Sequence, residues 1–120
     1  MVFRWDELAL EKVTEMVTRK DVSGAELTLT QAYFKKGAVV PVHRHDGERL
    51  IYVLQGALRA HFGDTDVTVR EGEVLVVPAG AVHQTESLDD TFLLTVARVP
   101  GDKLEVRSQK PEVKSPKPEA

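Results

Sequence analysis

An all-β fold is predicted for this 120-residue chain by three features of its sequence. Short segments rich in β-branched and apolar residues recur about every ten residues, turns containing glycine or proline separate them, and helical periodicity is nearly absent. The length suits one hydrophobic core and is too small for two. The sequence therefore predicts a single β-sandwich or β-barrel domain.

The N-terminal half begins with an arm, residues 1–26, that is expected to contain a short helix or strand. Residues 6–12 have a helical composition, but so short a segment is marginal without packing, so an extended arm is equally expected. Residues 27–34 alternate apolar and polar side chains up to a Lys-Lys-Gly turn, which predicts a strand. Residues 50–54 form a continuous apolar run and residues 58–62 alternate after the intervening glycine, which predicts a hairpin.

The C-terminal half continues with short strands of the same kind. Residues 67–70 alternate before a Glu-Gly-Glu turn, and residues 74–77 are apolar, mostly β-branched, and end at a proline. Residues 82–85 and 92–99 supply the last two predicted strands, with an acidic turn between them. Residues 108–120 are dominated by lysine, proline and glutamate, which cannot bury enough apolar area to offset the ordering entropy. They predict a flexible, disordered tail.

The charge balance limits the kinds of partner. The chain has 16 Lys and Arg against 19 Asp and Glu, a net charge of −3, which argues against a nucleic-acid partner and favours a small molecule. The absence of cysteine excludes disulfides and thiolate ligands. No signal-peptide pattern and no apolar run of membrane-spanning length occur, so we expect a cytoplasmic location and no membrane partner.

Three of the four histidines are candidates for a metal site. His43 and His45 lie two residues apart, so on a strand their side chains point to the same face. Pro78 and Gly80 predict a tight turn leading to His83, and a closed or two-sheet β architecture can bring that strand opposite the first pair. Three imidazoles suit a divalent transition metal such as Zn, Ni, Mn or Fe, and leave coordination positions open for water or substrate.

Two segments around these histidines resemble the two sequence motifs of the cupin family. Residues 37–56 read GAVVPVHRHDGERLIYVLQG, and residues 72–83 read GEVLVVPAGAVH. The chain resembles small single-domain cupins, nearest the KdgF-like sugar-acid cupins, which linearise unsaturated uronates. The resemblance implies a double-stranded β-helix, or jelly-roll barrel, over residues 27–107. It also implies a homodimer, because small cupins commonly pair sheet against sheet.

Arg49 occupies the motif position, seven residues before Gly56, where cupins usually have a glutamate or glutamine ligand. Arginine has no lone pair to offer and stays charged, so it cannot ligate. It clamps a carboxylate or phosphate of a metal-bound ligand, or it replaces the metal, or a one-residue bulge turns Glu48 inward as the fourth ligand. A purely structural ion pair of Arg49 with Glu48, Asp46 or Glu86 is the alternative.

Other side chains are assigned to the neighbourhood of the site or away from it. Thr95, Val96 and Ala97 stand where the KdgF-like group often has an acid and an aromatic residue. Arg98 is a candidate to replace that group's arginine, and its alternation with Ala97 leaves open which face it occupies. His61 is expected to face solvent. The candidate pocket residues beyond the histidines and Arg49 are Glu48, Gln31, Tyr33, Thr85 and Thr95.

Three hypotheses for function follow from the sequence. The first is a metal-dependent cupin enzyme of isomerase, lyase or dioxygenase type, in which the ion polarises a substrate oxygen and Arg49 orients a small carboxylate or sugar acid. The second is a metal-free module that binds or senses small anions through the histidines and Arg49. The third is a structural or interaction protein. No catalytic residue is assigned.

Overall fold

The computed structural model describes residues 1–99, which form one 3-10 turn and ten β-strands. The predicted tail, residues 108–120, and the last residues of the predicted barrel, 100–107, lie outside the described residues. The elements are η1 (Trp5–Glu7), β1 (Glu11–Thr14), β2 (Val17–Ser23), β3 (Leu27–Phe34), β4 (Val39–His43), β5 (Arg49–Gln55), β6 (Ala57–Phe62), β7 (Thr65–Arg70), β8 (Val74–Val77), β9 (His83–Ser87) and β10 (Thr91–Arg98).

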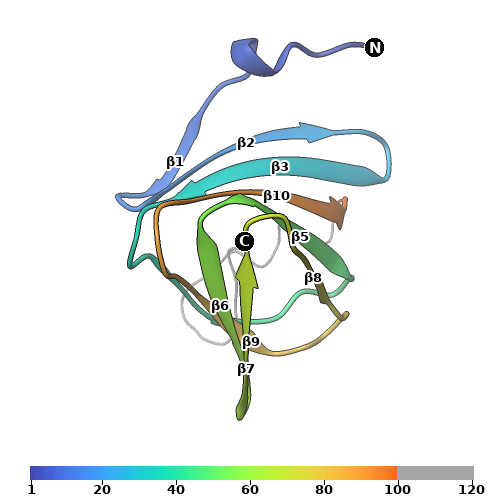
Figure 1. The fold of residues 1–120 in the computed structure, drawn as a ribbon. Helices are drawn as coiled ribbons and strands as arrows, with labels where there is room; N and C mark the ends of the chain where they lie inside the picture. The colour runs from blue at the N-terminus through green and yellow to red at the C-terminus, as the bar shows by residue number, and fades with distance from the viewer. Residues whose placement is uncertain (100–120) are drawn as a thin grey trace.

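The strands form two antiparallel sheets that face each other (Figure 1). The six-stranded sheet has the order β1-β2-β3-β10-β5-β8, and the four-stranded sheet has the order β4-β9-β6-β7. The predicted all-β architecture is confirmed, and each predicted strand from residue 27 onward corresponds to an observed one. Among the described residues, no helix is long and apolar enough to span a membrane.

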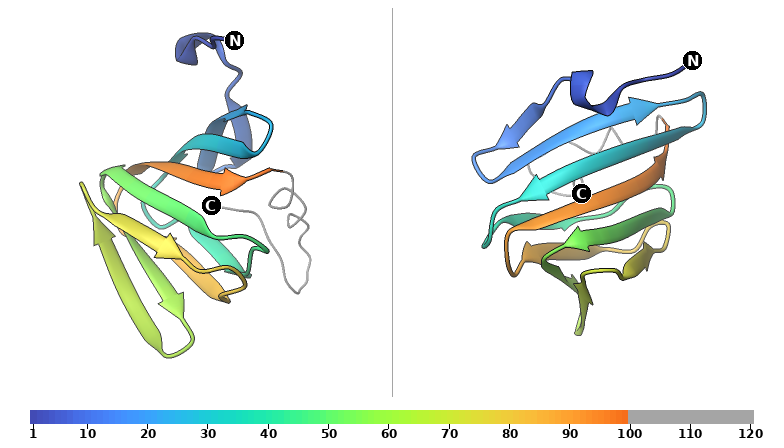
Figure 2. Two further views of the ribbon diagram at one scale, coloured as in Figure 1. Left: turned by 90° about the vertical axis from the view of Figure 1, so that its right-hand side faces the viewer. Right: turned by 45° about the horizontal axis from the view of Figure 1, so that its top comes forward.

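Residues within the predicted N-terminal arm extend the six-stranded sheet. Strand β2 pairs with β3 along its whole length, from Val17 opposite Phe34 to Ser23 opposite Thr28, and β1 pairs with β2. Of the segment with helical composition, residues 6–7 belong to the 3-10 turn η1 and residues 11–12 begin β1. That turn is held against the sheet because the Trp5 indole donates to the Gln31 side chain and the Lys20 ammonium donates to the carbonyl of Trp5 at 3.1 Å. Figure 2 shows β1 and β2 reaching beyond the four-stranded sheet.

The hydrophobic core lies between the two inner faces. Alternate residues of each strand point inward, as the pleat requires, and these are the buried ones. The largest fully buried apolar side chains are Phe34, Ile51, Leu58, Leu93, Val53 and Val77. The two sheets are therefore held by a continuous apolar layer, and the inner-facing positions at one end of that layer remain available for polar groups.

The outer face of the six-stranded sheet carries an apolar row. Cross-strand pairing aligns five side chains in one row over five strands, which we call the outer apolar row: Val22, Leu29, Val96, Leu50 and Val76. Leu29, Leu50 and Val76 are 38%, 40% and 51% exposed. The row therefore leaves apolar side chains partly exposed on the outer face of this sheet.

Gly56, the last glycine of the first motif, connects β5 and β6 in close contact with the start of β10. Its φ is +95°, a region that side chains with a Cβ rarely adopt. A Cβ at this position would lie 2.5 Å from Thr91 Oγ1 and 2.8 Å from Thr91 Cα, and would also overlap the carbonyl oxygen of Asp90. Both the backbone conformation and the space therefore require glycine.

We expect Gly56→Ala to lower the free energy of unfolding by about 3 kcal/mol or more, because backbone strain adds to a clash with backbone atoms. Gly72 is the matched control, since its φ is +85° and a Cβ there would meet nothing within 4 Å. Gly72→Ala should cost only the strain, about 1–2 kcal/mol. Urea denaturation of both variants measures the difference, and equal losses would contradict the role given to the contact with β10.

Candidate metal centre

His43, His45 and His83 converge at one end of the space between the sheets. His43 is the last residue of β4 and His83 the first of β9, and the two are directly opposite in the ladder that joins these strands. His45 lies two residues beyond the end of β4, yet it is as deeply buried as the other two. One nitrogen of each ring lies within 4.8 Å of the corresponding nitrogens of the other two. The sequence correctly grouped these three residues.

A backbone hydrogen bond joins the two motif segments. The amide of Gly80 donates to the carbonyl of His45 at 2.8 Å, so the turn that precedes His83 is tied to the loop that carries His45. Gly80 has a φ of +76°, which glycine adopts without steric cost. The glycine of the second motif therefore positions the histidine of the first.

Two of the histidine rings are oriented by backbone carbonyls. Nδ1 of His43 lies 2.6 Å from the carbonyl oxygen of Pro41, and Nδ1 of His83 lies 3.0 Å from that of Ala81. Because a carbonyl only accepts, Nδ1 must be the protonated donor in each ring. In the neutral imidazole Nε2 then carries the lone pair, which is the arrangement of a metal-bound histidine whose other nitrogen is fixed by a hydrogen bond.

His83 is held in the neutral form that a metal ligand needs. Burial lowers the pKa of His83, the Arg49 guanidinium lowers that pKa further, and the hydrogen bond to Ala81 opposes the two effects. Nε2 of His83 is buried and has no hydrogen-bond partner among the described residues. The ring of Phe62 stacks on the His83 ring with centroids 5.3 Å apart and planes 23° apart. A neutral ring with a buried, unused lone pair fits a transition-metal ligand.

Arg49 faces the histidines from the opposite sheet. It is the first residue of β5, it is 5% exposed, and its partner on β8 is the core residue Val77. Its charge is close enough to His83 to lower the pKa of that ring. Glu48 is exposed, so the inward slip that would have made it the fourth ligand does not occur. The centre therefore combines three imidazoles with a buried guanidinium.

The structure separates the remaining candidate pocket residues into two groups. Thr85 and Thr95 are buried and point inward, Thr85 two residues after His83 and Thr95 on β10. Gln31 and Tyr33 do not join the site, contrary to expectation. They alternate with the core residues of β3 and so project from the outer face, where Gln31 accepts the Trp5 hydrogen bond and Tyr33 packs on the ring of Phe92.

The other basic candidates also lie outside the centre. Arg98 is exposed at the end of β10, on the same face as Phe92, with its Cδ beside Gly47, so it does not act as the inward-facing cation. His61 lies on the outer face of the four-stranded sheet, where it bonds Asp66 at 2.6 Å and Glu86 at 3.3 Å. These two hydrogen bonds raise the pKa of His61. The expectation that His61 stays outside the site agrees with this position.

Two features of the site were missed from the sequence. Phe62 was recognised as alternating with Leu58 and Ala60, but the strand pairing that brings it over His83 could not be read from alternation alone. The carbonyls of Pro41 and Ala81 belong to the backbone, so no side-chain type in the sequence indicates their role. The sequence gives one indication of this role: Pro41 and Ala81 each precede a candidate ligand histidine by two residues.

Comparison with known proteins agrees with this geometry. The model of the cupin domain family matches residues 31–97, more than half of the chain. The oxalate-binding protein of Thermotoga maritima is 29% identical over 106 residues, with 78% of this chain and 88% of that protein covered. The structure of KdgF from Halomonas sp. superposes with a TM-score of 0.75 at 25% identity, over 87% of this chain and 99% of KdgF. Oxalate decarboxylase of Bacillus subtilis shares the fold, with a TM-score of 0.70, 20% identity, and 78% and 28% of the two chains covered.

Proposed function

The chain belongs to the cupin domain family, and on that premise we propose that it binds a divalent transition metal and a small carboxylate together. His43, His45 and His83 hold the ion, and Arg49 holds the carboxylate. The observation that carries the proposal is the position of Arg49, buried on the inner face opposite three imidazoles and close enough to lower the pKa of His83. The ion is Zn, Ni, Mn or Fe.

The metal part of the proposal is supported by the donor set. Three nitrogens within 4.8 Å of one another form one face of a coordination sphere and leave its remaining positions to water or ligand. When bound, the ion supplies Lewis acidity to an oxygen of the ligand. The chain's own residues do the rest: the carbonyls of Pro41 and Ala81 orient the rings of His43 and His83, and Phe62 stacks on the His83 ring.

The anion part of the proposal is supported by charge. A guanidinium beside a dication is repelled unless an anion lies between them, and its planar fork suits a carboxylate bound through two parallel hydrogen bonds. The name of the Thermotoga maritima relative indicates that it binds oxalate, a small carboxylate. Together with the likeness to KdgF, this favours a carboxylate or sugar acid as the ligand class. Metal-dependent turnover of isomerase, lyase or dioxygenase type is the enzymatic form of the same proposal.

A metal-free anion-binding module is the second candidate. It is favoured by one observation, that the positive charge of Arg49 acts directly on His83, where it would also oppose a bound cation. In this candidate the histidines and Arg49 form a cationic pocket for the carboxylate. The two candidates differ in whether the protein takes up an ion when no anion is present.

We further propose that the protein acts as a homodimer, with the cytoplasm as its predicted location. The outer apolar row supports this proposal, because it crosses five strands of one sheet and is partly exposed in the single chain. A two-fold interface uses the same patch on both copies, so this row would pair with its own counterpart. Leu50 lies near the middle of the row, so a substitution of Leu50 tests the interface.

We expect the protein to take up one divalent ion per chain, and His83→Ala to weaken that binding about 100-fold or more, since one of three ligands is lost. His61→Ala is the matched control because His61 lies on the outer face of the sheet. Calorimetric titration of chelator-treated protein with Zn, Ni, Mn or Fe(II) measures both. A wild-type protein that binds none of these ions while still binding oxalate would favour the metal-free candidate.

Substituting Arg49, the proposed carboxylate clamp, should separate its effect on anion binding from its effect on metal binding. We expect Arg49→Gln to weaken oxalate binding roughly 30-fold, because a charge-assisted bidentate contact is lost. The same change should strengthen binding of the metal alone, since a positive charge is removed and an amide oxygen is supplied. Arg59→Gln, on the outer face of β6, is the control. An oxalate affinity unchanged by Arg49→Gln would refute the clamp.

The dimer is tested by placing a charge in the outer apolar row. We expect Leu50→Lys to convert the dimer to a monomer, because an ammonium would be buried in an apolar interface. Val39→Lys introduces the same charge at a valine of the four-stranded sheet that is 51% exposed, and should leave the dimer intact. Light scattering coupled to size-exclusion chromatography gives the masses. A monomeric wild-type protein, or a dimeric Leu50→Lys variant, would contradict the proposed interface.

A further inference from the structure

Phe62 lies beside a candidate metal ligand in the four-stranded sheet. In the ladder that joins β6 and β9, His61 is opposite Gln84. The same register, continued by one residue, sets Phe62 opposite His83. On the other side of β9, His43 is opposite His83. The side chains of His43, His83 and Phe62 therefore form one row across β4, β9 and β6.

Both neighbours in this row contact the His83 ring. The ring centroids of His43 and His83 are 4.3 Å apart, and the two planes meet at 52°. The ring of Phe62 is nearly parallel to that of His83, with centroids 5.3 Å apart and planes 23° apart. Phe62 therefore turns toward the imidazole the face of its ring, where the negative part of the aromatic quadrupole lies.

Packing alone does not require an aromatic residue at this position. Phe62 is partly buried against the hydrophobic core, a role that an aliphatic side chain of similar size also fills. A flat ring with a negatively polarised face is what only an aromatic residue adds. The ring that it faces is that of His83, whose Nε2 is buried and has no hydrogen-bond partner among the described residues.

The contribution of this aromatic face depends on the charge of the imidazole. A neutral imidazole gains little from it. Coordination of a divalent ion through Nε2 draws electron density from the imidazole and makes the ring more positive, and a positive group within about 6 Å of an aromatic centroid is attracted to the face. Only the difference between the two states changes the affinity for the ion. The stacked phenyl ring therefore favours the ion-bound form of His83 over the free form.

The same aromatic face offsets an opposing charge. The Arg49 guanidinium acts on His83 from the six-stranded sheet and disfavours additional positive charge on that ring. Phe62 approaches the ring from the neighbouring strand β6. Because a hydrocarbon side chain has no lone pair, Phe62 attracts positive charge without occupying a coordination position.

We propose that Phe62 is a positioning residue of the metal centre, whose aromatic face holds the His83 ring and strengthens ion binding through that ring. This inference rests on the proposed function and adds to it a residue that is not a ligand. The Ala81 carbonyl fixes Nδ1 of His83, and Phe62 limits the tilt of the ring. The lone pair of Nε2 is thereby kept directed toward the nitrogens of the other two histidines.

The test changes the charge of the ring face and keeps the shape of the side chain. Phe62 is replaced by phenylalanine that carries one, two or three ring fluorines, which withdraw electron density from the face in steps. We expect the affinity for zinc, measured by calorimetric titration of chelator-treated full-length protein, to fall with each fluorine and to be roughly fivefold weaker with three. An affinity that stays constant along the series would overturn the inference, because a ring used only for packing keeps its apolar surface.

Phe34 is the matched control, because it is a buried phenylalanine of β3, in the sheet that carries none of the three histidines. The same fluorine series at position 34 should leave the affinity for zinc unchanged. Among natural residues, Phe62→Tyr keeps the aromatic face and should bind zinc within about twofold of wild type, whereas Phe62→Leu should bind roughly fivefold more weakly. An equal loss along the series at both positions would contradict a specific role of Phe62.

The outcomes also separate this inference from the proposed function on which it rests. If wild-type protein binds zinc, His83→Ala weakens that binding and the fluorine series at Phe62 has no effect, the metal centre stands and the role of Phe62 fails. If wild-type protein binds neither zinc nor Ni, Mn or Fe(II), the metal part of the proposed function fails and the role of Phe62 fails with it. A stepwise loss confined to position 62 supports both.

Discussion

The pairing of β4 with β9 is the constraint on which the metal centre depends. It sets His43 directly opposite His83, and the ladder is irregular between Val40 and His43, where the spacing of buried side chains changes from two residues to three. Without that irregularity the alternation that buries Val40 would turn His43 toward solvent, because a one-residue shift exchanges the two faces of a strand. The proline at position 41 lies within the irregular stretch, where a missing amide donor is tolerated, and its carbonyl orients the His43 ring.

Arg49 changes the electrostatics of a site that three imidazoles alone would leave neutral. Burial and the guanidinium act in the same direction on His83, so its ring is uncharged at neutral pH and its lone pair is available. A buried permanent cation next to a potential cation site is costly, and an anion shared between them offsets that cost. Under the proposed function the two partners would therefore bind cooperatively, because the ion attracts the carboxylate and the carboxylate shields the ion from Arg49.

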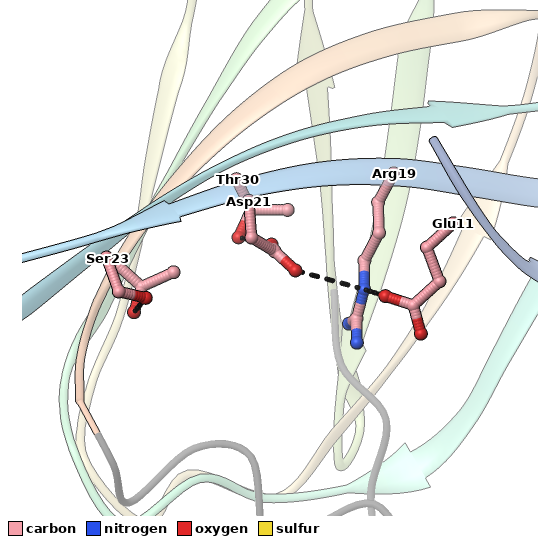
Figure 3. Close-up of polar contacts among 6 residues, drawn as sticks. Glu11, Arg19, Asp21, Ser23 and Thr30 are labelled. Carbon is pink, nitrogen blue, oxygen red and sulfur yellow. Dashed lines mark hydrogen bonds and ion pairs between the residues drawn. The ribbon is translucent and has the colours of Figure 1, made fainter. Parts of the chain in front are cut away.

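The sequence predicted the site residues whose positions follow from motif spacing. It misplaced the residues whose positions depend on how the strands pair. The three histidines, Gly80 and Arg49 follow from motif positions, and their positions in the structure agree. Gln31 and Tyr33 were misplaced although the needed signal was present, since they alternate with the buried Ala32 and Phe34. Strand β2 was not recognised because VTRKDVS carries polar residues on both faces. That pattern arises because only Val17 on the inner face of β2 packs against the core, the face becoming exposed toward Asp21 and Ser23 (Figure 3), and because part of the outer face contacts the N-terminal arm.

The two sheets supply different parts of the proposed site. The four-stranded sheet and the loop after β4 supply the three imidazoles, whereas Arg49 and the buried Thr95 belong to the six-stranded sheet. A substitution on the inner face of the six-stranded sheet would therefore leave the metal ligands in place, because no histidine of the centre lies on that sheet.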